Sequence, residues 1–149
     1  MKKGRIGKRV GVITKEIGEN WYIEEQIDKP VIQYLDLYKH IGKHAEQFIS
    51  IDSYNYTMDH IIEVINTPDY VFLNYCEPNG KIALEYYKKL MENVVVIVHI
   101  TNKRELEVAS IYPVTETKIK NRRIKEFAVK DKILIDRFSY KDEKELVTE

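Results

Sequence analysis

Val and Ile gather in two short runs near the amino terminus, and both runs predict β-strands. They cover residues 9–16 and 30–34 and are bounded by Gly, Asn and Pro, residues that commonly interrupt strands. We therefore expect two strands ahead of the first long helical segment.

The apolar residues that follow recur every three or four positions, which predicts two helices that each bury one face. Asp36 is the expected N-cap of the first helix and Thr57 that of the second. Pro68 is expected to end the second helix, because it forces the preceding residue out of helical conformation. The apolar positions are Leu37, Ile41, Ala45 and Phe48 in the first helix, and Met58, Ile61, Ile62 and Ile65 in the second.

From residue 69 onward the pattern predicts strands that follow one another closely. An Asn-Gly turn at residues 77–80 separates residues 70–75 from the alternating Ile82, Leu84 and Tyr86, as in a hairpin. Residues 83–91 also fit a short helix.

Residues 94–100 are the most buried predicted strand, and residues 106–112, ended by Pro113, are its expected antiparallel neighbour. A basic, helical segment is expected over residues 116–127. Helices grouped ahead of a run of strands predict an α+β fold, with N-terminal helices packed on an antiparallel β-sheet.

Composition places the chain among ordinary globular domains. Its 149 residues are 44% hydrophobic and 32% charged, so we expect a single domain over residues 1–149 with a polar tail over residues 141–149. The one cysteine, Cys76, excludes an internal disulfide and favours a reducing compartment. We find no signal peptide and no apolar run long enough to cross a bilayer, and therefore expect a cytoplasmic protein without a membrane partner.

Charge is balanced in sum but segregated along the chain. Lys and Arg total 24, as do Asp and Glu, which argues against a uniformly basic nucleic-acid binder. Residues 1–9 nevertheless carry only basic charges, residues 16–28 carry only acidic ones, and residues 115–125 carry five basic residues against one Glu. A local basic surface thus stays compatible with the zero net charge.

His40 and His44 are the first candidates for chemistry. One turn apart, they lie on one side of the predicted helix, with His44 turned towards its apolar face. Such a histidine can be a core residue bonded to a backbone carbonyl, or a proton donor or acceptor in an active site on the sheet. A zinc site is a further interpretation, with His60 or Asp36 as added ligands, although the spacing suggests no third ligand. A structural role is expected for His60 and His99.

A hydroxyl pair and a basic run occur at the end of the last predicted strand. Ser110 and Tyr112 alternate with apolar residues, so their side chains share one face of that strand. These groups suit phosphate capture, while the simpler interpretation is a half-buried aromatic next to a solvated helix face. The cations that follow are Lys118, Lys120, Arg122 and Arg123.

Several reaction classes lack their motifs in this chain. It has no Walker loop, no dinucleotide-binding fingerprint and no Gly-x-Ser-x-Gly motif. The residue types that remain are those of metal-independent ribonucleases, which need no cofactor. Such enzymes use an acid and a base for attack of the ribose 2′-OH on phosphorus, and cations or hydroxyls to stabilise the developing charge.

The order of these motifs resembles the phage-associated nucleases of the barnase, EndoU, colicin and RelE-like superfamily. The resemblance covers residues 30–126, the expected nuclease-like core. Two departures from the family pattern are Thr67, which intervenes between Asn66 and Pro68, and Ser110, which stands where Thr is commoner. The motifs are, in order, His40-Ile41-Gly42-Lys43-His44, residues 61–71, a hairpin, residues 94–99, Ser110-Ile111-Tyr112-Pro113 and the basic run 118–123.

The resemblance implies a small α+β fold and a metal-independent endoribonuclease, acting as a toxin or as an effector in conflicts between phage and bacteria. Matched by position, Lys43 and His44 are the family's basic-His pair, His40 opens its motif and Ser110 is its hydroxyl. We expect His44 to be the acid or base and His40 to assist it. The expected phosphate ligands are Ser110, Lys43 and the basic run 118–123, and Tyr112 is expected to stack on a base.

Two alternatives use the same fold without catalysis. A degenerate nuclease fold can bind and inhibit a host defence protein through the acidic residues 16–28. An RNA-binding module can hold RNA through residues 118–125 without cleaving it, with strong salt dependence. RNA, a cognate immunity or antitoxin protein, and a host defence protein are therefore the expected partners.

Overall fold

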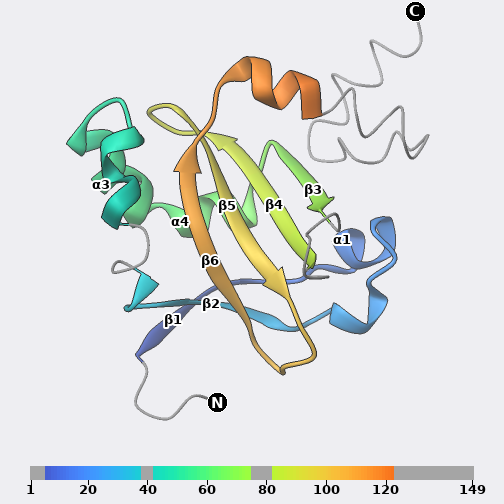
Figure 1. Cartoon of the computed structure of the whole chain (residues 1–149). Coiled ribbons are helices and arrows are strands. Elements are labelled where there is room, and N and C mark those ends of the chain that lie inside the picture. The colour runs from blue at the N-terminus through green and yellow to red at the C-terminus, as the bar shows by residue number, and fades with distance from the viewer. Residues whose placement is uncertain (1–5, 38–41, 75–81, 123–149) are drawn as a thin grey trace, which may run out of the picture.

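Six strands form a single sheet in this protein (Figure 1). The computed structural model describes residues 6–37, 42–74 and 82–122, and for residues 42–44 it describes the backbone alone. The order of strands across the sheet is β1-β2-β6-β5-β4-β3. The strands are β1 (Gly7–Val12), β2 (Pro30–Tyr34), β3 (Tyr70–Asn74), β4 (Ile82–Lys89), β5 (Asn93–Ile100) and β6 (Leu106–Pro113).

The helices are inserted between strands. Those between β1 and β2 are α1 (Lys15–Asn20) and η1 (Glu24–Gln26), and those between β2 and β3 are η2 (Gly42–Gln47), α3 (Ile51–Asp59) and α4 (Ile61–Asn66). Residues 116–122, after β6, are also helical. Within the described ranges no helix is long and apolar enough to span a membrane.

The strand pairing confirms the expected α+β class and corrects one detail of the sheet. β3, β4, β5 and β6 form the predicted antiparallel meander, and β4 is a strand rather than the alternative helix. β2, however, pairs with β6 in parallel, through Val31 with Leu106 and Ile32 with Glu107. The sheet is therefore mixed. The chain between these two strands includes η2, α3, α4 and the strands β3, β4 and β5, which is ample for the crossover that a parallel pair needs.

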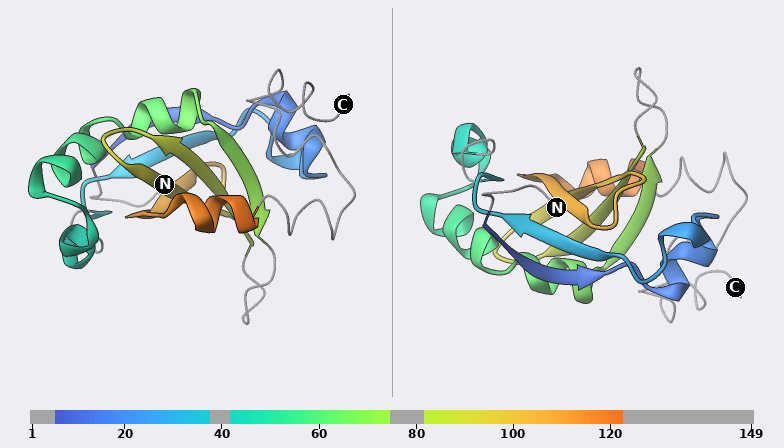
Figure 2. Two further views of the ribbon diagram at one scale, coloured as in Figure 1. Left: turned by 90° about the horizontal axis from the view of Figure 1, so that it is seen from above. Right: turned by 90° about the horizontal axis from the view of Figure 1, so that it is seen from below.

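The two faces of the sheet are covered differently (Figure 2). α4 contacts β1, β4 and β5 on one face and buries Ile61, Val64 and Ile65 there. A glycine permits this close packing, because a Cβ at Gly11 of β1 would collide with the side chain of Ile65. The helical residues 116–122 lie on the opposite face.

Helix caps explain why the amino-terminal elements have other bounds than those predicted from the sequence. The strand predicted over residues 9–16 ends at Val12, because Thr14 caps α1 by accepting a hydrogen bond from the Ile17 backbone N–H. α3 begins behind Ser50, whose side chain accepts from Ser53 N–H, so Thr57 is a buried residue inside α3 and not a cap. α4 ends before Pro68, as predicted.

The helix predicted behind Asp36 is only partly observed. Leu37 is helical, and residues 38–41 lie outside the described ranges. Residues 42–47 form a 3₁₀ helix rather than the continuous α-helix that the apolar spacing predicts. Gly42 stands at its start, and glycine is a poor α-helix former. The predicted turn at residues 77–80 and Cys76 also lie outside the described ranges, although the two strands of that hairpin do pair.

Tyr86 supplies a test of the core. Its side chain is fully buried, its hydroxyl has no hydrogen-bond partner among the described residues, and burial raises the pKa of Tyr86 far above its usual range. Tyr86→Phe should leave the free energy of unfolding at pH 7 unchanged or raise it by about 1 kcal/mol, because an unpaired buried hydroxyl is removed.

The pH dependence of stability should change in the same variant. Above pH ~10 the unfolded Tyr86 ionises whereas the folded one does not, so the native protein loses stability as pH rises and the Phe variant loses less. Urea denaturation at neutral and alkaline pH measures both effects. A Phe variant that is clearly less stable at pH 7 would show that the hydroxyl has a partner.

Candidate functional site

Polar side chains gather on the sheet face opposite α4. Directly paired residues on neighbouring strands point to the same side of a sheet, so the register defines three rows across β3, β4, β5 and β6. We call these rows the polar face. They are Tyr70, Tyr87, Val95 and Tyr112; then Phe72, Glu85, Ile97 and Ser110; then Asn74, Ala83, His99 and Glu107.

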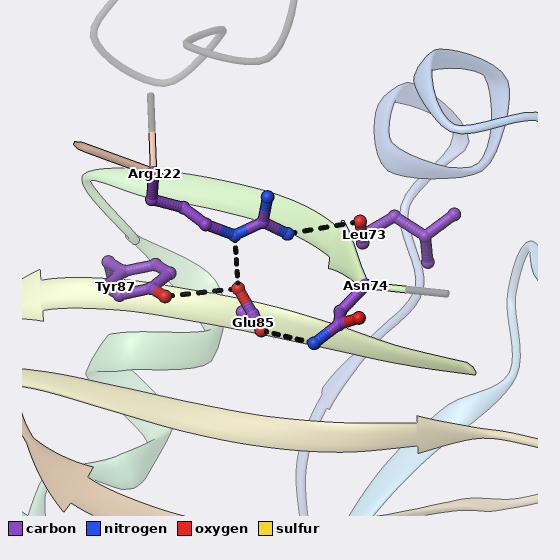
Figure 3. A network of polar contacts seen from close by, with 5 residues as sticks. All are labelled: Leu73, Asn74, Glu85, Tyr87 and Arg122. Atoms are coloured by element: carbon purple, nitrogen blue, oxygen red, sulfur yellow. Dashed lines mark hydrogen bonds and ion pairs between the residues drawn. The ribbon is translucent and has the colours of Figure 1, made fainter. Parts of the chain in front are cut away.

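Glu85 is a buried carboxylate at the centre of the polar face, and its two oxygens are held by three donors (Figure 3). Its Oε1 accepts hydrogen bonds from Nε of Arg122 at 2.9 Å and from the Tyr87 hydroxyl at 3.1 Å. Its Oε2 accepts from Nδ2 of Asn74 at 3.1 Å. A buried carboxylate is tolerated only with such partners, since its desolvation is otherwise far too costly.

The Tyr87 hydroxyl stays protonated in this setting. Burial raises the pKa of Tyr87 strongly, and the neighbouring carboxylate of Glu85 raises it further, while the Arg122 guanidinium acts in the opposite direction. Tyr87 therefore serves as a hydrogen-bond donor to Glu85 and not as a base at neutral pH.

Arg122 fastens the helical residues 116–122 to the sheet. Its Nη2 donates to the Leu73 carbonyl at 3.2 Å, and its guanidinium carbon lies 4.9 Å from the centre of the Phe72 ring. Ile119, one turn earlier, is buried in the apolar core. The predicted phosphate ligand Arg122 is thus turned towards the sheet, where it is paired with Glu85.

Ser110 and Tyr112 share one face of β6, as predicted, and a cation lies beside them. Both are half-buried, and Nζ of Lys118 lies 5.5 Å from the centre of the Tyr112 ring. Thr115 caps this helical segment by accepting from the Lys118 backbone N–H, which brings Lys118 back over the end of β6. Lys120 is exposed on the same segment, and Arg123 lies outside the described ranges.

The two amino-terminal candidate histidines are only indirectly placed. η2, which carries Lys43 and His44, contacts β6, so its backbone lies next to the strand of Ser110 and Tyr112. The side chains of Lys43 and His44, and the whole of His40, lie outside the described part of the chain. Their convergence on Ser110 stays a prediction.

The remaining histidines occupy opposite sides of the sheet. His60, between α3 and α4, has Nδ1 2.6 Å from the Tyr56 carbonyl oxygen and stacks on the Tyr56 ring at 3.8 Å, which fits the expected structural role. His99 instead lies half-buried on the polar face, directly across from Glu107. Among the described residues, no group of three His, Cys, Asp or Glu side chains is placed to hold a metal ion.

Sequence reasoning missed the centre of the polar face. Glu85, Tyr87 and Asn74 were not among the candidates. The signal was present in β4, where Glu85 and Tyr87 alternate with the apolar Leu84 and Tyr86. A carboxylate at the middle of an otherwise buried strand indicates a fixed partner, but the partner, Arg122, is 37 residues away.

Comparison with known proteins gives one family. The family described as phage-Barnase-EndoU-ColicinE5/D-RelE like nuclease3 matches residues 8–121. The match takes in β2 through β6, most of β1, and nearly all of the helical residues 116–122. No curated protein and no solved structure matches the chain.

Substitutions of Glu85 and Arg122, the ion pair at the centre of the polar face, should have strongly coupled effects on stability. The Glu85 and Arg122 side chains are only 10% and 17% exposed. Glu85→Gln and Arg122→Met should each lower the free energy of unfolding by about 3 kcal/mol, because each leaves the partner's charge without its counterpart. The double variant should lose less than the sum of the two losses, by about 1–3 kcal/mol.

A surface pair supplies the matched control for this double-mutant cycle. Lys15 and Glu19 are 79% and 54% exposed, and Lys15→Met with Glu19→Gln should show a coupling below about 0.5 kcal/mol. Urea denaturation of all variants gives the couplings. Additive losses for Glu85 and Arg122 would contradict the central place of their ion pair.

Proposed function

Since the chain belongs to the phage-Barnase-EndoU-ColicinE5/D-RelE-like nuclease family, we propose that it is an endoribonuclease that works on the polar face without a metal ion or other cofactor. The observation that carries this proposal is the grouping of Ser110, Tyr112 and Lys118 on that face. A hydroxyl, an aromatic ring and a cation are the groups that hold a phosphate and its neighbouring base.

The spacing on β6 fits one nucleotide unit. Ser110 and Tyr112 are two residues apart on one face, a separation of about 7 Å along the strand. A phosphate that accepts a hydrogen bond from Ser110 places an adjoining unpaired base within reach of the Tyr112 ring. Lys118, close to that ring, and the exposed Lys120 supply positive charge for the flanking phosphates, and Lys43 is proposed for the same role.

The proposed reaction is transesterification by the ribose 2′-OH. The 2′ oxygen gives its proton to a base and forms a bond to phosphorus, while the bond from phosphorus to the 5′ oxygen breaks and that oxygen takes a proton from an acid. The products are a 2′,3′-cyclic phosphate and a 5′-OH. Hydrogen bonds from Ser110 and charge from Lys118 stabilise the phosphorane.

His44 and His40 are the proposed acid and base, and the contact of η2 with β6 supports this assignment. His99 and Glu107, one row from Ser110 on the polar face, are the alternative pair. Glu85 is not assigned this role, because both of its oxygens are already bonded to donors. We assign it to the positioning of Arg122 and its helical segment.

A toxin or conflict effector of this kind needs a protein that restrains it in the cell that makes it. α1 and η1 carry the exposed acidic side chains of Glu19, Glu24 and Glu25, a surface separate from the polar face. In the active enzyme, this surface is the proposed docking site of an immunity or antitoxin protein. In a second candidate function, the same surface binds a host defence protein and the nuclease fold is not active.

Cleavage in the presence of a chelator tests the proposed function. We expect the protein to cleave single-stranded RNA in EDTA at an undiminished rate and to leave the 2′-deoxy analogue of the same sequence intact, because that analogue lacks the nucleophile. Denaturing gel electrophoresis and mass spectrometry of the cyclic phosphate give the readout. Cleavage that EDTA abolishes, or equal cleavage of both substrates, would contradict the mechanism.

Single substitutions then test the proposed residues. His44→Ala should lower the cleavage rate by about 10²- to 10⁴-fold through loss of proton transfer, and Ser110→Ala by about 10²-fold through loss of a hydrogen bond to the phosphorane. His60→Gln is the matched control, since His60 lies among the helices on the other side of the sheet, and it should retain the wild-type rate. Full activity in both His44→Ala and Ser110→Ala would refute the assigned site.

A further inference from the structure

Two cations at the turn between β5 and β6 have side chains without a partner among the residues that the structure describes. Lys103 and Arg104 are both exposed, and their side chains form no ion pair or hydrogen bond with the described residues. Elsewhere the exposed Lys15 is paired with Glu19, and Arg122 is paired with Glu85. We call Lys103 and Arg104 the hairpin cations.

The turn that carries the hairpin cations is held at both of its ends. Nζ of Lys29 donates to the Thr101 carbonyl at 3.0 Å, and the Tyr34 hydroxyl donates to Oε1 of Glu105 at 3.0 Å. The backbone N–H of Lys103 donates to Oγ1 of Thr101 at 3.2 Å, which tightens the turn further. The nearest acid in sequence, Glu105, is thereby engaged with Tyr34.

The hairpin cations lie at the far end of β6 from the helical residues 116–122 (Figure 1). Leu106 and Tyr112 are six residues apart on this strand, which corresponds to about 20 Å. Lys118 lies at the Tyr112 end. β6 therefore runs between two cationic groups, with Ser110 and Tyr112 near one of them.

We propose that the hairpin cations form a second phosphate-binding subsite, so that the preferred substrate is an extended single strand lying along β6. This inference rests on the proposed function for its class of ligand. A strand that reaches both cationic groups spans at least about four nucleotides, within the usual size of single-strand binding sites. A single strand is favoured over a duplex, because a base can stack on Tyr112 only when it is unpaired.

A polynucleotide fits this arrangement better than an acidic protein. Its charge repeats at regular intervals, so it can engage cations at both ends of β6 and present a base to Tyr112 at the Lys118 end. The one acidic side chain of the polar face on β6, Glu107, is half-buried and lies across from His99. A nucleic-acid strand that runs along β6 from the hairpin cations passes His99 before it reaches Ser110.

The test compares short and long probes on the full chain. Fluorescence anisotropy would measure the binding of labelled 2′-deoxy oligonucleotides, which resist the proposed cleavage. The short probe, of about 2 nucleotides, cannot reach both cationic groups, whereas the long probe, of about 12 nucleotides, can. The double charge reversal Lys103→Glu with Arg104→Glu should weaken binding of the long probe at least tenfold. It should reduce the slope of log affinity against log salt by about 1.4, the value for two lost phosphate contacts on a single strand. Binding of the short probe should change much less.

A matched control keeps the change in net charge the same. Lys8→Glu with Lys15→Glu reverses two exposed cations, one on the α4 side of β1 and one at the start of α1, and should affect both probes equally and weakly. An unchanged long-probe affinity in the hairpin variant would overturn the inference and leave these cations to an acidic protein partner. Equal weakening of short and long probes would also overturn it.

Failure of the second phosphate-binding subsite can be distinguished from failure of the proposed endoribonuclease function. Wild-type protein that cleaves RNA in EDTA, combined with no length-dependent effect of the hairpin variant, contradicts the second subsite alone. A length-dependent loss of binding in a protein that does not cleave RNA supports the subsite and contradicts the enzyme.

Discussion

α4 covers only one face of the sheet, and this constraint sorts the side chains of β4, β5 and β6. Leu84 and Tyr86 of β4 turn to the helix side, whereas Glu85 and Tyr87 turn to the polar face. The period of two along a strand makes the choice strict, because a shift by one residue would place a carboxylate against α4. Tight packing on one side thus leaves the other side available for polar groups.

The polar face is itself covered unevenly. Its Glu85 end is closed by the helical residues 116–122 through Arg122 and Ile119, and this closure gives the carboxylate its partners. Its β6 end is less covered, and Ser110 and Tyr112 remain half-buried there. One sheet face is therefore divided between a rigid, paired part and a part that a ligand can reach. An active site needs this combination, because reacting groups must be held in place and still be accessible.

Local patterns in the sequence were sufficient for the elements whose stabilising contacts are local. The apolar run over residues 94–100 predicted β5, and residues 106–112 predicted β6 as its neighbour. The alternation of Ser110 and Tyr112 with apolar residues predicted their shared face, and short connections predicted the meander. The parallel pairing of β2 with β6 was not predictable from local pattern, since it joins Val31 to Leu106 across all of α3 and α4. The cap at Thr14 was missed because Val12 and Ile13, directly ahead of it, and Thr14 itself also fit a strand.

The candidate site was predicted in part for the same reason. Ser110, Tyr112 and Lys118 are close in sequence, and the fold brings them together. Glu85 and Arg122 meet only through the tertiary structure, so neither residue alone indicated the pair. Family membership agrees with the observed architecture and indicates a nucleic-acid substrate.

We propose above all that nucleic acid binds on the polar face of the sheet. An NMR titration of isotopically labelled protein with a 2′-deoxy oligonucleotide tests this most directly, because it reports on each backbone amide. The largest chemical-shift changes are expected on β6, on the neighbouring part of β5 and on residues 116–122, while α4 should be unaffected. Changes centred on α1, or on the helices over the opposite face, would contradict it.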